Sequence, residues 1–208
     1  MRYVALDGPD GSGKSSQAAA LVAWLAQRGR RVLHVREPGS TPVGEALREL
    51  LLAPATGELA LLTEVLLFSA ARAELVARVI APALARGELV VAERSWLSTA
   101  VYQLDATPSL QRAAADREWF EDLTRRVHGG CLPDRVFVLD VPPAVAAARR
   151  SQRTHDRFEA RDASYQLAVR EGFLSAAARE PRARVIDASR SFADVQAELR
   201  AALAGVPA

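Results

Sequence analysis

The chain has 208 residues, half of them hydrophobic and a quarter charged, so intrinsic disorder is excluded and one globular domain is expected. The formal net charge of +2 is too small for the strong positive field of a nucleic-acid-binding surface, so no nucleic-acid partner is expected. A single cysteine, Cys131, excludes a disulfide scaffold and fits a reducing cytosol. No apolar run reaches the ~18 residues of a membrane span, and the N-terminal apolar stretch is too short for a signal peptide, so we expect a cytoplasmic protein without membrane contact.

Short apolar runs that predict strands alternate with longer stretches of helical periodicity. In chain order these are strand Tyr3–Leu6, helix Lys14–Arg28, strand Arg31–Val35, helix Val43–Leu52, one long helix Leu61–Arg86 or two that are interrupted at Pro82, strand Leu89–Ala92, helices Ser98–Leu104 and Leu110–Val127, strand Val136–Leu139, helices Pro143–Arg150 and Ser164–Arg179, strand Arg184–Ile186 and helix Phe192–Leu203.

This alternation of strand and helix predicts βαβ units, because crossovers of such length force neighbouring strands to pair in parallel. Continuously apolar strands also fit a sheet that is buried on both faces. We therefore expect one α/β domain over residues 1–208, a three-layer sandwich with a five-stranded parallel sheet flanked by helices. Its ligand site is expected at the carboxyl ends of the strands.

A glycine-rich segment between the first strand and the first helix fits the phosphate-loop pattern G-x-x-x-x-G-K-[ST]. Its residues are Gly8, Pro9, Asp10, Gly11, Ser12, Gly13, Lys14 and Ser15. Backbone N–H groups of such a loop surround a phosphate, aided by the positive end of the helix. Lys14 would reach the β- and γ-phosphates and the Ser15 hydroxyl would bind Mg²⁺, so the segment predicts a nucleoside triphosphate site.

Residue counts narrow the class of phosphate-loop protein. Lys14 is the one lysine among 27 basic residues, which strengthens its assignment to a position where arginine cannot serve. The chain has no asparagine and no second lysine, so it lacks the Asn-Lys-x-Asp guanine reader of GTPase switches. The Leu-Ser-Gly-Gly-Gln signature of transporter ATPases is also absent, which leaves small-molecule kinases and other P-loop ligases or ATPases.

Three further stretches are specific in combination: Arg36–Thr41 (REPGST), Thr63–Arg72 (TEVLLFSAAR) and Glu93–Gln103 (ERSWLSTAVYQ). Together with the phosphate loop and a later Asp156–Glu159 (DRFE), they resemble the thymidylate kinase family, and the likeness runs from residue 3 to about residue 187. The resemblance implies the P-loop kinase fold and the reaction ATP + dTMP → ADP + dTDP, with ATP and Mg²⁺ as cofactors.

The resemblance also implies roles at the phosphates. Arg36 would clamp the acceptor phosphate, and Arg94 would contact the same phosphate or the one in transfer. Glu93 stands where the family usually has Asp; it would hold Mg²⁺ through water, or it pairs with a neighbouring arginine. Asp10 would face the sugar and phosphate of the acceptor, or it only forms the turn of the loop.

A thymine site is implied as well. Phe68 and Arg72 are four residues apart and share a helix face, where the family stacks thymine on the ring and bonds its O4 with the arginine. Thr99 and Gln103, also four apart, would face the base edge, unless they lie on a solvated helix face. Tyr102 matches the tyrosine that the family places under the sugar, where a ribose 2′-OH would collide. Phe68 could instead be a core residue.

The phosphate loop contains no arginine, so a transition-state charge has to come from elsewhere. The polar stretch around residues 149–157 holds Arg149, Arg150, Arg153 and Arg157, where the family has its lid. We expect a mobile lid at about 149–161, with Arg153 catalytic and Arg149 or Arg157 helping to bind ATP. The alternative is a helix end whose arginines interact with the helix dipole.

The resemblance implies a homodimer built from helices such as the one that carries Leu75 and Val79. Two other functions stay open: a kinase for another nucleoside monophosphate or small metabolite, and a P-loop ATPase that works as a switch. Assays with dTMP, dUMP, CMP and AMP would separate the first, and ATP turnover without an acceptor would indicate the second.

Overall fold

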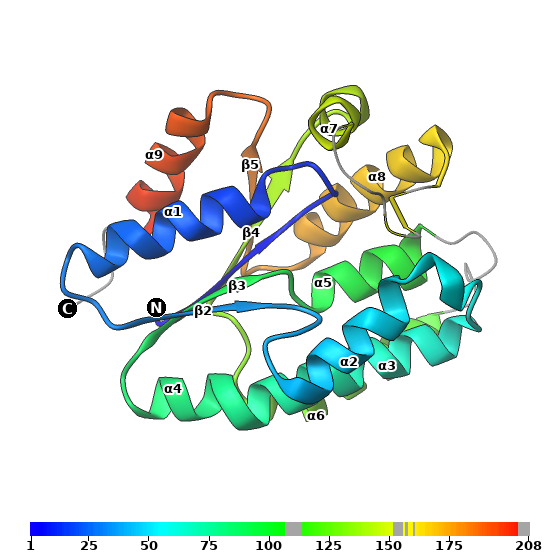
Figure 1. The fold of residues 1–208 in the computed structure, drawn as a ribbon, viewed down its shortest axis with the longest axis horizontal. Coiled ribbons are helices and arrows are strands. Elements are labelled where there is room, and N and C mark those ends of the chain that lie inside the picture. Colours follow the sequence, from blue (N-terminus) through cyan, green and yellow to red (C-terminus); the bar gives the residue numbers. More distant parts are fainter. Residues whose placement is uncertain (107–113, 152–155, 157, 160, 204–208) are drawn as a thin grey trace.

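The structure is a computed structural model that describes residues 1–106, 114–151, 156, 158–159 and 161–203. Within them, five parallel strands form one sheet in the order β2-β3-β1-β4-β5. The strands are β1 (Tyr3–Asp7), β2 (Val32–Arg36), β3 (Leu89–Glu93), β4 (Arg135–Asp140) and β5 (Ala183–Asp187). Helices cover both faces of the sheet (Figure 1), which confirms the predicted three-layer sandwich.

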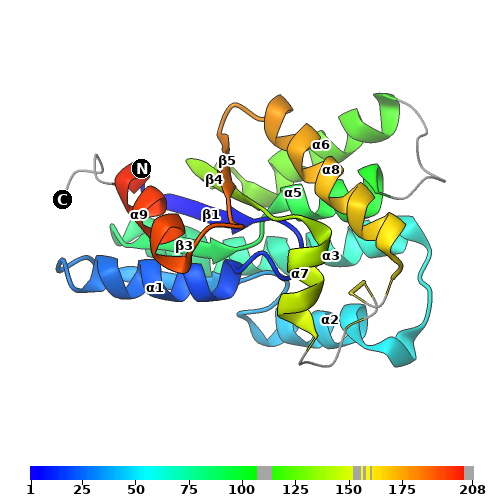
Figure 2. The same ribbon diagram turned by 90° about the horizontal axis from the view of Figure 1, so that it is seen from above.

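The two helix layers differ in size (Figure 2). One face of the sheet is covered by α1 (Lys14–Ala26) and α9 (Phe192–Leu203). The larger layer on the other face is formed by α3 (Leu61–Leu75), α4 (Ala81–Ala85), α5 (Trp96–Thr99), α6 (Ala114–His128) and α8 (Ala163–Arg179). Two more helices flank the carboxyl edge of the sheet: α2 (Pro42–Leu52) packs against α3, and α7 (Pro143–Arg150) packs against α8.

Alternate residues of the three central strands, β1, β3 and β4, enter two separate hydrophobic cores. In β1, Tyr3 and Ala5 pack beneath the larger helix layer, whereas Val4 and Leu6 pack beneath α1 and α9. All four side chains are buried. Burial on both faces explains why these central strands read as continuous apolar runs in the sequence.

Each strand continues one residue past its predicted carboxyl end and stops at a charged residue. These residues are Asp7, Arg36, Glu93, Asp140 and Asp187. The sequence-based prediction stopped at the last apolar residue, but backbone pairing does not require an apolar side chain. The carboxyl edge of the sheet is therefore a row of ionisable groups.

The long helix predicted over Leu61–Arg86 is not broken at Pro82. α3 continues through a π-helical segment, Val76–Ile80, into α4. Pro82 falls in the first turn of α4, and the wider π turn before it shifts the hydrogen-bond register, so the missing N–H is tolerated. A second π-helical segment, Ala100–Asp105, continues α5 and carries Tyr102.

The strand order creates a crevice at the carboxyl ends of β1 and β4. The chain leaves β1 for β2 on one side and leaves β4 for β5 on the other, so the two connections diverge. Open α/β sheets bind ligands where connections diverge in this way. The segment after β1 enters this crevice and ends at Gly13, the N-cap of α1.

The close approach of this segment to β4 can be tested with two glycines. Gly8 and Gly13 both have positive φ, 131° and 93°. A Cβ at Gly8 would lie 2.5 Å from the Leu139 carbonyl oxygen, whereas a Cβ at Gly13 would meet nothing within 4 Å. We expect Gly8→Ala to lower the free energy of unfolding by about 3 kcal/mol and Gly13→Ala by about 1 kcal/mol, because only the first adds a clash to the backbone strain. Urea unfolding measures both losses, and equal losses would contradict the close approach.

Candidate active site

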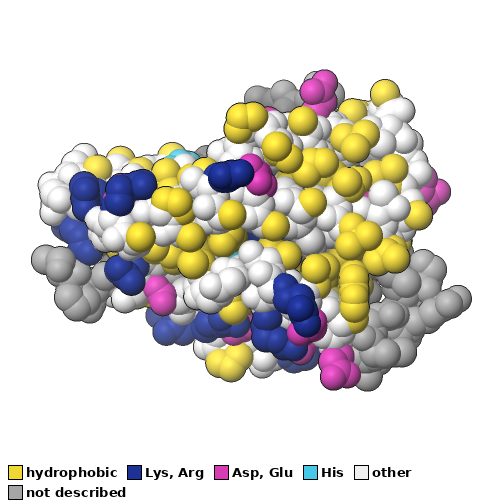
Figure 3. Space-filling model, turned by 90° about the horizontal axis from the view of Figure 1, so that it is seen from below, with side chains coloured by type: hydrophobic (Ala, Val, Ile, Leu, Met, Phe, Trp, Pro, Cys, Tyr) yellow, Lys and Arg dark blue, Asp and Glu magenta, His cyan; other side chains and the backbone are white. Residues whose placement is uncertain are grey.

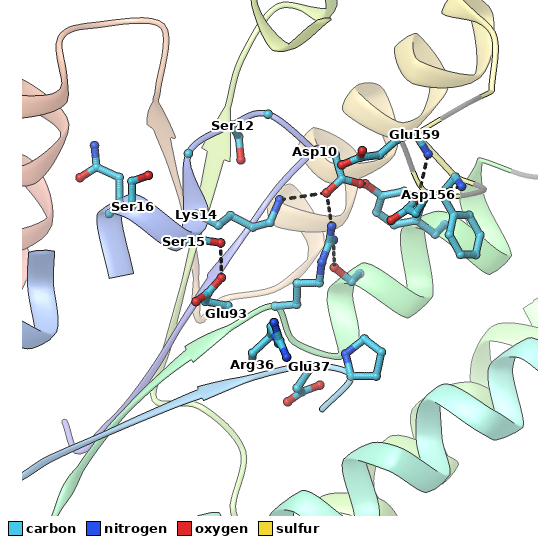
Figure 4. A pocket seen from close by; sticks show the side chains of 18 of the residues that line it. Asp10, Ser12, Lys14, Ser15, Ser16, Arg36, Glu37, Glu93, Asp156 and Glu159 are labelled. Carbon is cyan, nitrogen blue, oxygen red and sulfur yellow. Dashed lines mark hydrogen bonds and ion pairs between the residues drawn. The ribbon is translucent and has the colours of Figure 1, made fainter. Parts of the chain in front are cut away.

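A cavity of about 810 Å³ opens at the carboxyl edge of the sheet (Figure 4). One end is lined by the phosphate loop from Asp10 onward, the start of α1, Arg149, Ala188 and Arg190. The other end is lined by residues of α2, α3 and the α5 region, among them Arg48, Phe68, Arg72, Thr99 and Gln103. Glu93 and Arg94, at the end of β3, also line the cavity. The cavity therefore joins the predicted triphosphate site to the predicted acceptor site.

The phosphate loop holds Lys14 with its ammonium group turned inward. Nζ donates to the carbonyl oxygens of Gly8 and Pro9, each at 2.8 Å, and lies 3.8 Å from Asp10 Oδ1. Burial, together with the charge of Arg94, lowers the pKa of Lys14 to about 8, although neighbouring carboxylates act in the opposite direction. An anion in the loop would offer this ammonium stronger acceptors than two carbonyl groups.

Asp10 joins three elements of the site. Its Oδ1 accepts a hydrogen bond from Arg94 Nη2, and its Oδ2 accepts one from the Tyr102 hydroxyl at 2.9 Å. Burial raises the pKa of Asp10, but the charges of Arg94 and Lys14 outweigh it and hold the pKa well below its usual range. The carboxylate is therefore ionised and fixes both side chains.

Arg94 is held in an uncommon backbone conformation. Its φ is 73°, in the left-handed region that residues with side chains rarely adopt. Its Nη1 donates to Ser98 Oγ at 3.0 Å, in addition to the bond from Nη2 to Asp10. Ser98 in turn donates to Asp7, which is fully buried and also accepts from Ser95. This network aims the guanidinium into the cavity before any ligand is bound.

Ser15 and Glu93, the predicted Mg²⁺ residues, are in contact (Figure 4). Ser15 Oγ donates to Glu93 Oε2, and His34 Nε2 lies 3.0 Å from Glu93 Oε1. Burial raises the pKa of Glu93, but the bonds from His34 and Ser15 bring it below its usual value. In the part of the chain that the structure describes, no group of three or more His, Cys, Asp or Glu side chains could hold a metal ion alone. A cation here would need ligand oxygens from a bound nucleotide.

Arg72, predicted to bond the thymine, is buried in the wall of the acceptor end. Its Nε donates to Glu37 Oε2 at 2.5 Å. Its Nη2 donates to the Ser95 carbonyl oxygen at 3.1 Å and to Thr99 Oγ1 at 3.2 Å. No described residue accepts a hydrogen bond from Nη1. The structure thus brings Arg72 and Thr99 into contact and adds Glu37, whose place in the motif gave no sign of this contact.

Aromatic rings form the rest of the acceptor end. Phe68 is half-buried, not a full core residue, and its ring centroid lies 6.2 Å from that of Phe158. The Tyr102 ring contacts Phe158 edge-on at 5.8 Å and Phe173 at 5.9 Å. Gln103 is buried and donates to Glu64 Oε2 at 3.1 Å, so it lies on a packed helix face and not on a solvated one.

Two arginines, one at the end of β2 and one in α2, add positive charge to the acceptor end. Arg36 Nη2 lies 3.1 Å from both carboxylate oxygens of Glu45. Arg48 Nη1 donates to the Pro38 carbonyl oxygen at 3.0 Å. Burial and the nearby charges of Arg36 and Arg94 lower the pKa of Arg48, which indicates that three guanidinium groups converge on this part of the cavity. Such a cluster favours an anion.

The described residues include only part of the predicted lid. Arg153 and Arg157 lie outside the described residues, so their assignments remain predictions. Arg149 lines the cavity, and both of its terminal nitrogens donate to the Ala188 carbonyl oxygen at 3.1 Å. Arg150 is buried and donates to the Asp10 carbonyl oxygen, which links α7 to the phosphate loop.

Sequence reasoning missed several residues that line the cavity or shape the site: Asp7, His34, Glu37, Arg48, Ser98, Arg150 and Phe158. Glu37 and Phe158 fall inside the motifs, so the pattern marked the segments but not the roles. Arg48 sits among apolar residues of α2 and gave no signal. Asp7 and His34 act through partners on other strands or helices, which spacing along the chain does not reveal.

The fold, with a phosphate loop after β1 and a cavity that leads to a second anion site, defines a P-loop kinase. The sequence model of the thymidylate kinase family matches residues 6–199. The chain belongs to the thymidylate kinase family.

Named thymidylate kinases are similar in sequence to this chain over nearly its whole length. It is 41% identical to a thymidylate kinase of Symbiobacterium thermophilum over 199 residues, 95% of this chain and 90% of the relative. It is 42% identical to one of Neisseria gonorrhoeae over 206 residues, 98% and 97% of the two chains. A crystal structure of thymidylate kinase from Ehrlichia chaffeensis superposes with a TM-score of 0.77 at 28% identity and covers 97% of each chain.

The pKa of Lys14 can be measured directly, because ¹⁵N-lysine labelling gives one side-chain signal in a protein with one lysine. We expect a midpoint near pH 8, against ~10.4 for an ordinary lysine. Pyrophosphate should move the midpoint upward, because an anion stabilises the ammonium form. Asp10→Asn should move it downward, because Asp10 raises the pKa of Lys14 and also neutralises Arg94. A midpoint near pH 10 in the unliganded protein would contradict the buried position of the amine.

Proposed function

We propose that the protein transfers the γ-phosphoryl group of ATP to dTMP and forms ADP and dTDP. The observation that carries this proposal is the cavity that joins the phosphate loop to the Arg72 site, with Arg94 and Asp10 between them. Phosphoryl transfer asks the protein mainly to hold two polyanions in line and to stabilise their charge. Membership of the thymidylate kinase family supports dTMP as the acceptor.

ATP would bind with its phosphates in the loop. Lys14 would exchange the carbonyl oxygens of Gly8 and Pro9 for phosphate oxygens, which are charged and so stronger acceptors. The N-terminus of α1 adds its positive end. Arg149, held against the Ala188 carbonyl at this end of the cavity, would contact the nucleotide.

The oxygens of Ser15 and Glu93 fit Mg²⁺, a hard cation that prefers oxygen ligands and usually shares them with substrate phosphates. The side chains already meet, and the carboxylate is ionised at neutral pH because its pKa lies below the usual value. When bound, Mg²⁺ would neutralise charge on the ATP phosphates. Ser15 and Glu93 would fix its place relative to Lys14.

Among the described residues, Arg94 is the cation best placed for the phosphoryl group in transfer. Asp10 and Ser98 hold its guanidinium in position, so little reorganisation is needed when charge develops. Arg36 and Arg48 would take the acceptor phosphate. Arg36 would then exchange Glu45 for the phosphate, since both are bidentate acceptors.

The base would lie between Phe68 and the Arg72 guanidinium. Glu37, Ser95 and Thr99 fix Arg72 through Nε and Nη2, which leaves Nη1 as a donor for a carbonyl oxygen such as thymine O4. Phe68 supplies a half-buried ring for stacking. The site therefore selects a flat base with an oxygen acceptor at its edge.

The proposal is tested by rates of ADP release with dTMP, its ribo-analogue, dUMP, CMP and AMP. We expect the highest kcat/KM with dTMP and little ATP turnover without an acceptor. In Tyr102→Ala, the preference for dTMP over its ribo-analogue should fall by roughly 1–3 kcal/mol, because the ring that would collide with a 2′-OH is removed. An unchanged preference would contradict this role of Tyr102.

Tyr102→Phe is the matched control. It keeps the ring against Phe158 and Phe173 and removes the hydroxyl that donates to Asp10. Its sugar preference should stay close to that of the wild type, while its kcat should fall because Asp10 and Arg94 are less firmly held. A faster reaction with CMP or AMP in the wild type would point to a kinase for another monophosphate.

We also propose that two copies associate through the face that carries α3 and α6. Exposed apolar side chains lie on α2, α3 and α6: Val43, Leu50, Leu62, Leu66 and Trp119. Figure 3 shows hydrophobic side chains gathered over one half of this side of the molecule, with few charged groups among them. Leu75, which lies on the helix expected to form the interface, is itself fully buried in the chain's own core, so other residues of that helix would make the contact.

Sedimentation equilibrium would test the association. The wild type should have twice the mass of one chain, because an apolar face of this kind is usually covered. Leu66→Glu should shift the equilibrium toward monomers, while Val185→Glu, at an exposed apolar residue of β5, should not. Equal behaviour of both variants would argue against the α3–α6 face.

In the described part of the chain, no helix is both long and apolar enough to cross a bilayer.

A further inference from the structure

His34 contacts the carboxylate that faces the phosphate loop. It lies in β2 opposite Val91 of β3, and Glu93 is two residues further along β3 on the same face of the sheet. Such diagonal neighbours are within reach of long side chains. His34 Nε2 lies 3.0 Å from Glu93 Oε1, while Glu93 Oε2 accepts from Ser15. Each carboxylate oxygen of Glu93 thus has its own partner.

The contact matters because a glutamate side chain has three rotatable bonds. Fixing such a side chain costs conformational entropy, and a bond from Ser15 alone leaves the carboxylate free to turn about that contact. The imidazole ring has two torsions and stands on a paired strand, so it is a stiff second support. The side chain of His34 is 32% exposed and that of Glu93 12%, so the contact lies at the rim of the site. Another side chain can therefore be substituted for the imidazole ring without overpacking the core.

The chemistry of the partner also fits a carboxylate that must stay available to a cation. In the described residues, no arginine or lysine lies within ion-pair distance of Glu93, although arginine is abundant in the chain. An arginine would bind both carboxylate oxygens at once and neutralise the negative charge that the cation needs. An imidazole N–H takes one oxygen and leaves the other directed at Ser15.

We propose that His34 is a positioning residue: it holds the Glu93 carboxylate against Ser15 and thereby strengthens binding of the divalent cation that accompanies ATP. This rests on the proposed roles of Ser15 and Glu93 in holding Mg²⁺. Hydrogen-bond partners behind metal-binding carboxylates fix the orientation of those carboxylates.

The test is calorimetric titration of ATP into the protein in EDTA and in excess Mg²⁺, which needs no turnover. The ratio of the two affinities measures the contribution of the cation. In His34→Phe the ratio should fall about 3- to 10-fold, less than the ~10- to 100-fold typical of fully buried partners of metal-binding groups, because this contact is partly exposed. The affinity in EDTA should not change, because His34 does not reach the phosphate loop itself.

Matched variants separate positioning from a loss of structure. In His34→Gln the amide nitrogen is as many bonds from Cα as Nε2 and can donate to Glu93, so the ratio should return to within about twofold of the wild type. Glu88→Gln removes an exposed ion pair next to β3 and should leave the ratio unchanged. His34→Ser provides a second deletion of the ring should the phenylalanine variant fold poorly, and it should show the same loss.

A double variant links the effect to Glu93. Glu93→Gln alone should lower the cation ratio, and adding His34→Phe should lower it no further, because the carboxylate that His34 positions is already gone. A full additional loss in the double variant, or no loss in either His34 deletion, would overturn the proposal. If Glu93→Gln itself keeps the wild-type ratio, the assignment of Glu93 to the cation is wrong, whereas dTMP phosphorylation is tested separately by the acceptor panel.

Discussion

The bond between Asp10 and Arg94 is the interaction on which the site depends. It connects the loop after β1 to the end of β3, and through Tyr102 it reaches the π-helical segment that borders the acceptor end. A carboxylate beside bound triphosphate is unfavourable by itself, so its place requires cations around it. Asp10 thereby connects the proposed triphosphate site to the proposed acceptor site, whose spacing is the geometric requirement of direct phosphoryl transfer.

Two cations of the site have internal partners that resemble the ligands they are proposed to bind. Lys14 contacts two carbonyl oxygens, and Arg36 faces both oxygens of Glu45. These contacts hold the two side chains in place in the unliganded protein. A bound phosphate would offer Lys14 charged acceptors, which are stronger than the two carbonyl oxygens.

The sequence was sufficient for the sheet, the phosphate loop and the segments around the acceptor, because each depends on local pattern. The predicted contact residues from Arg36 to Gln103 all line the cavity. Contacts between residues far apart in the chain could not be predicted from local pattern: Glu37 is 35 residues from Arg72, and Arg150 is 140 residues from Asp10. The continuous helix past Pro82 was also ambiguous, since the π turn that accommodates it has no sequence pattern of its own.

Phe158 has a consequence for how the acceptor end can vary. It comes from the segment before α8, yet its ring touches Phe68 of α3 and Tyr102, so the three rings form one wall. A smaller residue at any one position leaves a gap that the other two cannot fill, and a larger one displaces both neighbours. These positions are therefore free to change only as a group during evolution, and an engineer who wishes to admit a bulkier base has to redesign the wall as a unit.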